Sequence, residues 1–455
     1  MGAKMSMKRE FSILNVTESD AKRYKVAPLS FEEVKEIIEK DDGTKLLEVI
    51  NEGLLLDINM KGECLLYPHK QHHRKYLATL LGLALIRGSI ECVKVLLDNG
   101  ADTSCKLVDS YTSVLECACH SSSVGLVKLL IERGITFDDQ AISRSFEHIY
   151  PIRGNDDKRH QITNILLPYI NDVMYAGYNG HTFLNLVCGK GNIDAARSLL
   201  ERGADRDAVD RHRHDALYYA SEYGHLAVVK LLLDWNKSRP ISLDQLNRAL
   251  INAVVWGGQL EAARILTDYG ANAHTEALLG SVTGDYLTVY LAVPMATFLL
   301  DHGADLRATD YEGYSTLHRV LLHRVGGRDY RGSLALSKLL LERGADANEV
   351  IDKTCETMLL CCCRHCVELV APLLQHGADA NLAHAITGET PLMVAALDGR
   401  ISTVKLLLEH GADVNQTNLA GQTVLDLLAA KGKGWEFTEI AQLCMEHANN
   451  KPVLK

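Results

Sequence analysis

A short sequence element returns along this chain at a nearly constant interval, and this repetition restricts the fold more than any other feature. Each copy is an apolar segment that ends in Gly-Ala followed by Asp or Asn, and the glycines are Gly100, Gly203, Gly270, Gly303, Gly344, Gly377 and Gly411. The last five are spaced 33, 41, 33 and 34 residues apart. The longer spacings before them divide at Gly134, near Tyr169 and at Asn236 into intervals of similar length. A fixed period in this range is typical of proteins built from stacked structural repeats.

Each repeat is expected to contain two amphipathic helices. The second helix ends at the repeated glycine, as in the segments 229–233 and 404–408, where apolar residues follow helical spacing. Glycine is favoured just past a helix end because it adopts the left-handed conformation without strain, and Asn, which stands at 236, tolerates it next best. Another glycine separates the two helices, at Gly88, Gly191, Gly224, Gly258 and Gly399. Two helices this short cannot bury their apolar faces alone, so we expect neighbouring repeats to stack.

One unit carries the motif of a known family. Residues 388–415, GETPLMVAALDGRISTVKLLLEHGADVN, resemble an ankyrin repeat, whose signature is T-P-L-H-x-A at a period of about 33 residues. Weaker versions of the motif begin at Gly180, His214 and Tyr314. The chain is therefore similar to the ankyrin-repeat family. The resemblance implies an all-α solenoid of about twelve helix-turn-helix repeats with hairpin finger loops.

The domain boundaries follow from the first and last copies of the repeat. We expect an N-terminal segment at 1–29, the solenoid at 30–448 and a tail at 449–455. Ser30 and Glu33 form a capping-box pattern that starts the first helix. A C-terminal cap begins at about 421, and residues 141–172 form a degenerate repeat that lacks both Thr-Pro and Gly-Ala. Pro372 falls inside an expected second helix and predicts a kink or a shifted helix start.

Two insertions interrupt the period. The first, at 60–76, lies in the hairpin between two repeats and places Lys and Arg beside His69, His72 and His73. The second, at 324–333, lies between the two helices of one repeat. Insertions in solenoids fall in loops on one face and often have a function. We interpret the first as a solvated basic loop. Its alternative, a metal site, lacks a Cys or carboxylate partner at a suitable spacing.

Composition excludes several classes of function. The net charge of −10 opposes general binding to nucleic acid. No apolar run reaches the roughly 20 residues that span a bilayer, and no secretory signal precedes the first helix. Twelve cysteines in 455 residues are too few for a disulfide scaffold and indicate reduced thiols. We therefore expect a soluble monomer of the cytoplasm or nucleus.

The densest group of metal-ligating residue types is Cys355, Cys361, Cys362, Cys363, His365 and Cys366. Alignment of the repeats by their glycines places Cys361 and Cys362 on Ala395 and Ala396, the small positions where helices are expected to pack. Consecutive helical residues also diverge by about 100° each, so three in a row cannot chelate one ion. We interpret the cysteines as core residues, with a metal or redox sensor as the alternative.

No motif of an enzyme active site occurs in the chain. No glycine-rich phosphate loop follows a strand, no nucleophile motif such as G-x-S-x-G is present, and there is almost no strand pattern. We predict that the protein is not an enzyme and binds no cofactor, and we assign no catalytic or metal residue.

The resemblance to ankyrin-repeat proteins implies a protein partner bound on a concave face made by the finger loops and the first helices. Candidate contacts come from one finger loop and from the positions that match Met393, Leu397 and Asp398. They are Arg211, His212, Arg213, Tyr218, Glu222, Tyr223, Asn252, Trp256, His318, His323 and Arg364. Tyr, Trp and Arg are frequent interface hot spots. The alternative is that Tyr218 and Trp256 pack against the neighbouring repeat.

Two positions fit patterns of covalent modification. The N-terminus fits the myristoylation pattern at Gly2, and the following Lys8 and Arg9 would support a membrane tether. The resemblance implies that asparagines in ankyrin finger loops can be substrates of an asparaginyl hydroxylase, and the candidates are Asn415 and, with it, Asn272, Asn348 and Asn381. The alternative role of these side chains is hydrogen bonding within the turn.

These features predict a non-enzymatic scaffold or adaptor that binds another protein on the concave face of a repeat array. One alternative is a substrate-recognition subunit of a ubiquitin ligase, although no recruitment box is evident after Glu436. Another is a pathogen effector that acts by binding a host protein. A sensor based on the cysteine cluster is the alternative from a different class.

Overall fold

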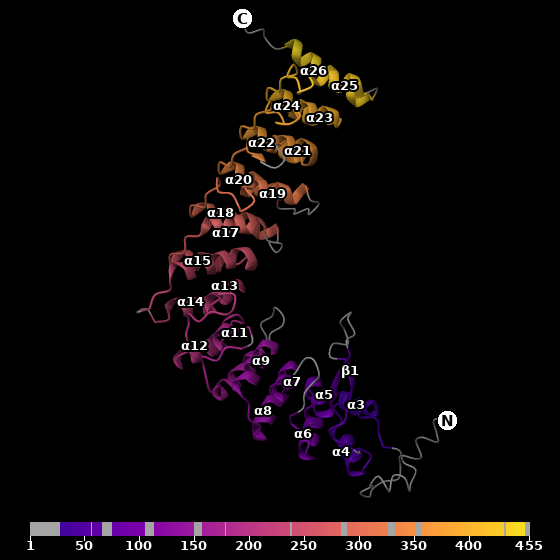
Figure 1. The fold of residues 1–455 in the computed structure, drawn as a ribbon, viewed down its shortest axis with the longest axis vertical. Coiled ribbons are helices and arrows are strands. Elements are labelled where there is room, and N and C mark those ends of the chain that lie inside the picture. The colour runs from indigo at the N-terminus through magenta and orange to yellow at the C-terminus, as the bar shows by residue number, and fades with distance from the viewer. Residues whose placement is uncertain are drawn as a thin grey trace, which may run out of the picture. The chain divides into compact units, whose positions relative to one another are not determined.

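The structure, a computed structural model, describes residues 28–450 except 56, 66–74, 105–112, 150–156, 178, 237–238, 284–288, 326–332, 352–355 and 432–433. The chain divides into two compact units, Met1–Ala220 with Ala227–Trp235 and Ser221–Leu226 with Asn236–Lys455. Each unit is a stack of paired helices (Figure 1).

The first unit contains six helix pairs. They are α3 (Phe31–Glu39) with α4 (Gly43–Asn51), α5 (Leu80–Arg87) with α6 (Ile90–Asp98), α7 (Val114–His120) with α8 (Val124–Glu132), α9 (Asp139–Ile149) with α10 (Asp157–Leu166), α11 (Phe183–Cys188) with α12 (Ile193–Glu201), and α13 (Ala216–Glu222) with α14 (Leu226–Asp234). A 3₁₀ turn, η1 (Leu167–Tyr169), follows α10. The boundary between the units falls within the last pair, since residues 221–226 belong to the second unit.

The second unit also contains six pairs. They are α15 (Leu243–Asn252) with α16 (Leu260–Asp268), α17 (His274–Thr283) with α18 (Val289–Asp301), α19 (Thr316–Val325) with α20 (Ser333–Glu342), α21 (Met358–His365) with α22 (Val370–Gln375), α23 (Pro391–Leu397) with α24 (Ile401–Glu409), and α25 (Val424–Lys431) with α26 (Trp435–Asn450). A π-helical turn, η2 (Ala253–Gly257), extends α15, and a 3₁₀ turn, η3 (Val367–Leu369), precedes α22. The described residues thus hold twelve pairs, which confirms the all-α class and the expected number of repeats.

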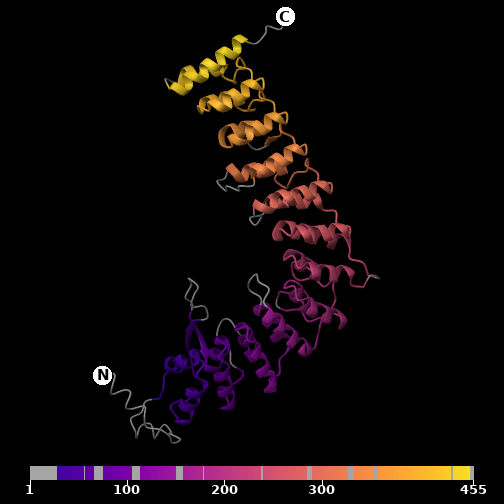
Figure 2. The same cartoon turned by 180° about the vertical axis from the view of Figure 1, so that it is seen from behind.

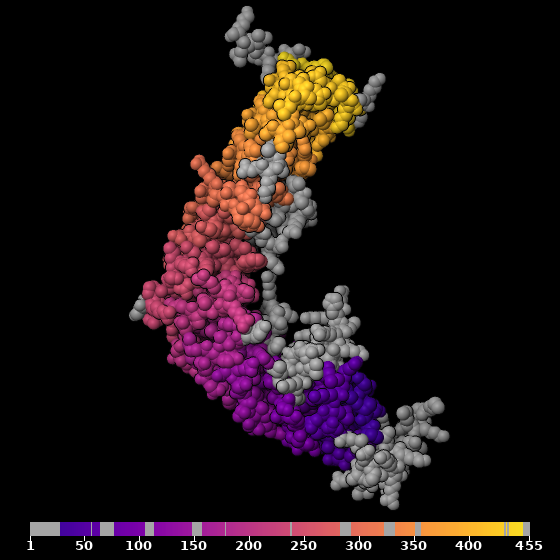
Figure 3. Space-filling model, in the orientation of Figure 1, coloured from indigo at the N-terminus to yellow at the C-terminus, as the bar shows by residue number. Residues whose placement is uncertain are grey.

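Within each unit the helices form two layers. In the first unit α3, α5, α7, α9 and α11 pack in series, and α4, α6, α8, α10 and α12 form the second series. In the second unit α19, α21 and α23 lie along one side, and α20, α22 and α24 lie along the other (Figures 1 and 2). Adjacent repeats of this unit abut along a continuous surface in the space-filling view (Figure 3). The two helices of a pair and the pairs on either side therefore bury one another, as expected for repeats that are not stable alone.

Small residues allow the helices to approach closely. Ala395 and Ala396 on α23 are fully buried, and Val404 and Leu407 on α24 pack into the same interior. At the matching positions of α21, Cys361 is 6% exposed and Cys362 is fully buried. The interpretation of the cysteine cluster as core is confirmed for Cys361, Cys362, Cys363 and Cys366, whereas Cys355 lies outside the described residues.

The glycines past the second helices adopt the conformation that the sequence predicts. Gly344 has φ 92° and Gly411 has φ 86°, and Asn236, the one substitute, has φ 48°. In each case the chain turns sharply after the helix, which only the left-handed conformation permits. The backbone N–H of the following Ala345 or Ala412 donates back to the carbonyl of Leu340 or Leu407 and closes the helix.

The two ends of the insertion at 60–76 pair with each other as a β-hairpin. We expected a loop here and almost no strand in the chain, and this expectation was wrong for the residues that form the hairpin. Strands β1 (Lys61–Leu65) and β2 (Lys75–Thr79) pair antiparallel, with Lys61 opposite Thr79 and Leu65 opposite Lys75. A second short pair, β3 (Val350–Ile351) with β4 (Glu356–Thr357), lies in another finger. Strand pairing depends on a partner segment elsewhere in the chain, so a local pattern does not reveal it. His69, His72 and His73 lie outside the described residues.

The irregular repeats follow the sequence closely. The side chain of Ser30 accepts from the backbone N–H of Glu33 and the Glu33 carboxylate accepts from Ser30, which confirms the capping box. Pro372 lies within α22, which is shortened to six residues and preceded by η3, so the shifted start is also confirmed. The degenerate segment 141–172 still forms a helix pair, α9 and α10. No helix in the described part of the chain is both long and apolar enough to cross a membrane.

Candidate functional site

The predicted contact residues fall into two structural classes, according to their position on the first helix of a repeat. The residues that match Met393 lie in the first turn, except Asn252, which is the last residue of α15. Those that match Leu397 and Asp398 lie in the last turn or just after it. Met393 itself is 1% exposed, whereas Asp398 is exposed. In this repeat the residue just past the first helix is therefore accessible, and its first turn is not.

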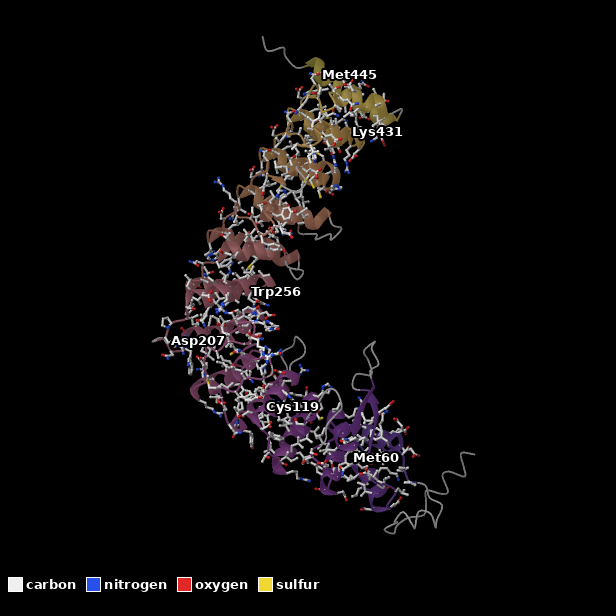
Figure 4. The ribbon with its side chains drawn as sticks, in the orientation of Figure 1. Met60, Cys119, Asp207, Trp256, Lys431 and Met445 are labelled. Atoms are coloured by element: carbon white, nitrogen blue, oxygen red, sulfur yellow. The ribbon has the colours of Figure 1, made fainter. Side chains whose placement is uncertain are left out.

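Trp256 and Tyr223 are large aromatic side chains at the exposed end of first helices in the second unit. Trp256, labelled in Figure 4, lies in η2 and is 52% exposed, and Tyr223 is 41% exposed. The two positions are close, because a Cβ on Gly257 would stand 2.2 Å from the backbone oxygen of Glu222. The alternative was that Trp256 packs against the neighbouring repeat. It does not hold for the exposed half of the side chain. Both residues remain predicted contacts of a partner.

Trp256 lies in a π-helical turn. Instead of ending in a regular turn, α15 continues into η2, and the backbone N–H of Gln259 donates to the oxygen of Ala253 at 2.8 Å. Within this turn Ala253, Val254 and Val255 are buried, and Trp256 is the exposed residue that follows them. Single π-turns within α-helices are frequent at functional sites.

Asn252 and His318 are buried, so their prediction as partner contacts is corrected. Asn252 is 2% exposed on α15 and His318 is 1% exposed on α19. The Nδ1 atom of His318 lies 3.4 Å from Oε1 of Glu349 in the next finger, and the hydroxyl of Ser315 donates to Oε2 of Glu349 at 2.6 Å. Burial raises the pKa of Glu349, but the bonds from His318 and Ser315 outweigh it and lower the pKa. The first turn of α19 therefore faces the next finger, and the end of α15 at Asn252 is enclosed by protein.

Three further predicted contacts on helices are Arg364, Glu222 and His323. Arg364 on α21 is half-buried and pairs with Glu389 at 2.9 Å and with Glu356 at 3.7 Å, so it links two neighbouring fingers. Glu222 is half-buried at the end of α13. His323 lies on α19, and its side chain is outside the described residues.

The finger at residues 210–214 carries the predicted contacts Arg211, His212 and Arg213, all of which are exposed. Beneath them the side chain of Asp210 is fully buried and accepts from the backbone N–H groups of His212 and His214, each at 2.8 Å. The hydroxyl of Tyr219 also donates to this carboxylate at 2.6 Å. Burial raises the pKa of Asp210, but these hydrogen bonds more than offset that effect and lower the pKa. The buried, charged carboxylate of Asp210 thus fixes the backbone of the finger tip.

Tyr218 belongs to the base of the same finger. Its ring stacks on His214, with centroids 3.7 Å apart and an interplanar angle of 5°, and it is half-buried. The alternative reading of Tyr218 as a packing residue is therefore correct in part. His181 approaches the same carboxylate, with Nε2 3.3 Å from Oδ2 of Asp210.

The finger at residues 310–314 repeats this arrangement in the second unit. Asp310 accepts from the backbone N–H groups of Glu312 and Tyr314 at 2.9 and 3.0 Å. Arg319 donates to the carboxylates of Asp310 and Glu312. Burial raises the pKa of Asp310, and the bonds from Arg319 and the two N–H groups outweigh it, so the pKa is lowered.

Apolar residues at three other finger tips were missed by the sequence interpretation. Tyr311, Ile386 and Leu419 are 92%, 65% and 74% exposed. Each stands between the residue whose side chain caps the finger and a glycine with positive φ, as in Asp310-Tyr311-Glu312-Gly313. These exposed residues could have been predicted from the sequence, because each lies between an Asp, His or Asn and a Gly that follows it by three or four positions.

The asparagines in the fingers have different roles. Nδ2 of Asn381 donates to the oxygen of Gly411 at 3.2 Å, and Oδ1 accepts from the N–H of Asp413 at 2.6 Å. Asn348 makes the same pair of bonds to Gly377 and Asp379 in the repeat before it. The side chain of Asn415 is exposed, and its hydroxylation stays a prediction. Gly2 lies outside the described residues.

The chemistry of the cysteines agrees with their burial. Burial raises the pKa of the thiols of Cys361 and Cys363 to about 12, so they are protonated at neutral pH and poor nucleophiles or ligands. Cys119 in the first unit, labelled in Figure 4, is also fully buried and its pKa is raised to about 12. In the part of the chain that the structure describes, no three His, Cys, Asp or Glu side chains are arranged to hold a metal ion.

Comparison with known proteins gives consistent matches. A family model described as ankyrin repeats (3 copies) matches residues 155–242 and 328–418. An ankyrin repeat and KH domain-containing protein of Caenorhabditis briggsae is 30% identical over 172 residues, which cover 37% of this chain and 6% of that protein. Ankyrin repeat protein nuc-2 of Neurospora crassa is 30% identical over 162 residues, 35% of this chain and 15% of that protein. A putative ankyrin repeat protein of fowlpox virus is 25% identical over 358 residues, 76% of this chain and 55% of that protein. The chain spans less than two thirds of the length of each of these relatives.

Proposed function

Because this chain belongs to the ankyrin-repeat family, whose repeats are protein-interaction modules, we propose that it is a non-enzymatic adaptor. It binds another protein with the last turns of its first helices and with its finger tips. A substrate-recognition subunit or an effector that captures a host protein would use the same surface.

The half-exposed Trp256 beside Tyr223 is the observation that carries this proposal. Burying large aromatic side chains at an interface contributes strongly to affinity, and Trp and Tyr are the most frequent hot spots with Arg. The backbone around Trp256 is fixed by hydrogen bonds, since the N–H groups of Gly258 and Gln259 both donate to the oxygen of Ala253. Adjacent repeats hold the two rings on rigid elements, which reduces the entropy lost on binding.

The test compares two aromatic variants in one unit. Tyr223→Ala combined with Trp256→Ala is expected to weaken partner binding by about 2–4 kcal/mol, since both anchors are lost. The matched control is Tyr269→Ala, which truncates a ring that is 44% exposed just past the second helix α16. Proteins captured from a cell extract by the wild-type chain are identified by mass spectrometry, and the affinity of the captured protein is then measured for each purified variant.

Folding of the variants is checked by circular dichroism and urea unfolding, because exposed truncations seldom change stability by much. Loss of binding in the double variant with retention in Tyr269→Ala supports the proposal. Equal affinity of wild type and a folded double variant would remove the aromatic pair from the binding surface.

A further inference from the structure

An arginine occupies a backbone position where the matching fingers have glycine. Arg213 has φ 65°, in the left-handed region. The finger around it has the same hydrogen bonds as the finger at 310–314: Arg213 N–H donates to the oxygen of Asp210 at 3.0 Å, and Gly313 N–H donates to that of Asp310 at 3.0 Å. Gly313 has φ 84°. The left-handed conformation strains a long side chain and not a glycine, and such strain concentrates where a side chain has a function.

The tip that contains Arg213 is cationic and held rigidly. Arg211, His212 and Arg213 are consecutive and all exposed. Two of the tip's backbone N–H groups are bound by the buried carboxylate of Asp210, and the N–H of Arg211 donates to the oxygen of Asn179 in the neighbouring finger at 3.3 Å. The side chains are therefore presented from a fixed backbone, which lowers the entropic cost of binding.

The tip is positively charged, whereas the chain as a whole is negatively charged. The chain carries a net charge of −10. Within this finger, however, Asp210 is buried below the tip and Asp207 pairs with Arg206 at 3.1 Å. The ring centroid of His212 lies 5.8 Å from that of His214, and the His214 ring stacks on Tyr218. The three rings therefore follow one another in a stack that ends at His212. Guanidinium groups beside an imidazole are suited to carboxylates, to which Arg donates in pairs.

We propose that the tip at 211–213 binds an acidic segment of the protein partner, rich in Asp and Glu. This inference rests on the proposed function and specifies part of the partner's surface. Three residues on one tip match a short run of carboxylates. A nucleic acid fits less well, because its binding needs an extended basic stripe and the tip carries only three consecutive basic residues.

The experiment measures binding of a fluorescein-labelled peptide of alternating Glu and Ser to the full chain by fluorescence anisotropy. Arg213→Gly and Arg211→Gln are each expected to weaken binding about tenfold. Arg213→Gly is also expected to raise the thermal midpoint of unfolding, because glycine relieves the left-handed strain. The matched control, Arg197→Gln, removes an exposed arginine from α12 in the same unit and should bind the peptide as the wild type does. Binding should weaken as salt is raised.

A gain in stability together with a loss of peptide binding in Arg213→Gly distinguishes function from structure, since a merely structural arginine would not give this combination. Equal affinity of the wild type and Arg213→Gly would overturn the proposal, as would stronger binding of a labelled single-stranded polynucleotide than of the acidic peptide. The peptide tests the tip alone, and the aromatic variants test the adaptor function with a whole protein. If the peptide fails while Tyr223→Ala with Trp256→Ala still abolishes capture, only the tip inference is lost.

Discussion

At the scale of single residues, a buried aspartate holds the backbone of two fingers in place. Asp210 and Asp310 each lie inside a finger and accept two backbone N–H groups, together with a bond from Tyr219 or Arg319. An ionised acceptor makes hydrogen bonds stronger than those between neutral groups. These two fingers therefore each depend on one carboxylate remaining charged.

This dependence predicts a loss of finger stability in acid. The folded-state pKa of Asp210 is lowered, so its stabilisation is fully present above the unfolded pKa of about 3.9 and is lost as the pH falls through the folded pKa. Asp210→Asn should reduce local stability at neutral pH by about 1–2 kcal/mol and weaken its dependence on acid. Hydrogen exchange of the amides at 205–219, measured at several pH values, checks this. The exposed Asp194→Asn on α12 is the control and should leave these amides unchanged.

At the scale of elements, short segments between helices decide which side chains are accessible. The π-turn η2 contains the exposed Trp256, and the first turn of α19 buries His318 against Glu349 of the next finger. The fingers are in turn tied to the following repeat by asparagine side chains, as Asn381 is to Gly411 and Asp413. These bonds cross from one repeat to the next and hold successive fingers in line.

Removal of one such link should weaken a single junction. Asn381→Ala deletes one donor and one acceptor and is expected to lower the stability of the junction between the α21–α22 repeat and the α23–α24 repeat by about 1–2 kcal/mol. Asn415→Ala, which removes the exposed asparagine at the matching position of the next finger, is the control and should cost much less. Urea unfolding followed by hydrogen exchange of the last three helix pairs measures the difference. Equal effects of the two substitutions would show that the Asn381 bonds contribute nothing net.

At the scale of the whole molecule, each repeat contacts its immediate neighbours, so stability is distributed along the chain. Among the principal helix contacts of the described residues in the second unit, helices α20, α22, α24 and α26 pack in series and against first helices of their own or an adjacent repeat. In such arrays stability is close to a sum of repeat and interface contributions. Damage at one repeat is expected to spread to adjacent repeats and to fade beyond them.

A strained glycine position tests this locality. Gly411 has φ 86° and no atom would meet an added Cβ within 4 Å, so Gly411→Val should destabilise through backbone strain alone, by more than about 1 kcal/mol. Hydrogen-exchange protection should fall in α23 to α26 and stay unchanged in α3 to α8. Gly411→Asn is the matched control and should cost less, because Asn tolerates this conformation, as Asn236 does. Uniform loss of protection along the chain would contradict the repeat architecture.

The sequence by itself determined the repeated features of this protein, because they depend on local physical chemistry. The period, the left-handed position of Gly411, the capping box at Ser30 and the shifted start at Pro372 each follow from a residue's own conformational preferences. Burial of Cys361 and Cys362 followed from their alignment with alanines. Only the tertiary structure decided which side of a helix meets a neighbour. Met393, Asn252 and His318 share a position in the repeat alignment that the folded chain buries, and Trp256 lies in a π-turn that no local pattern predicted. The β1–β2 hairpin and the strained Arg213 also depend on contacts or backbone geometry that become visible only when the chain is folded.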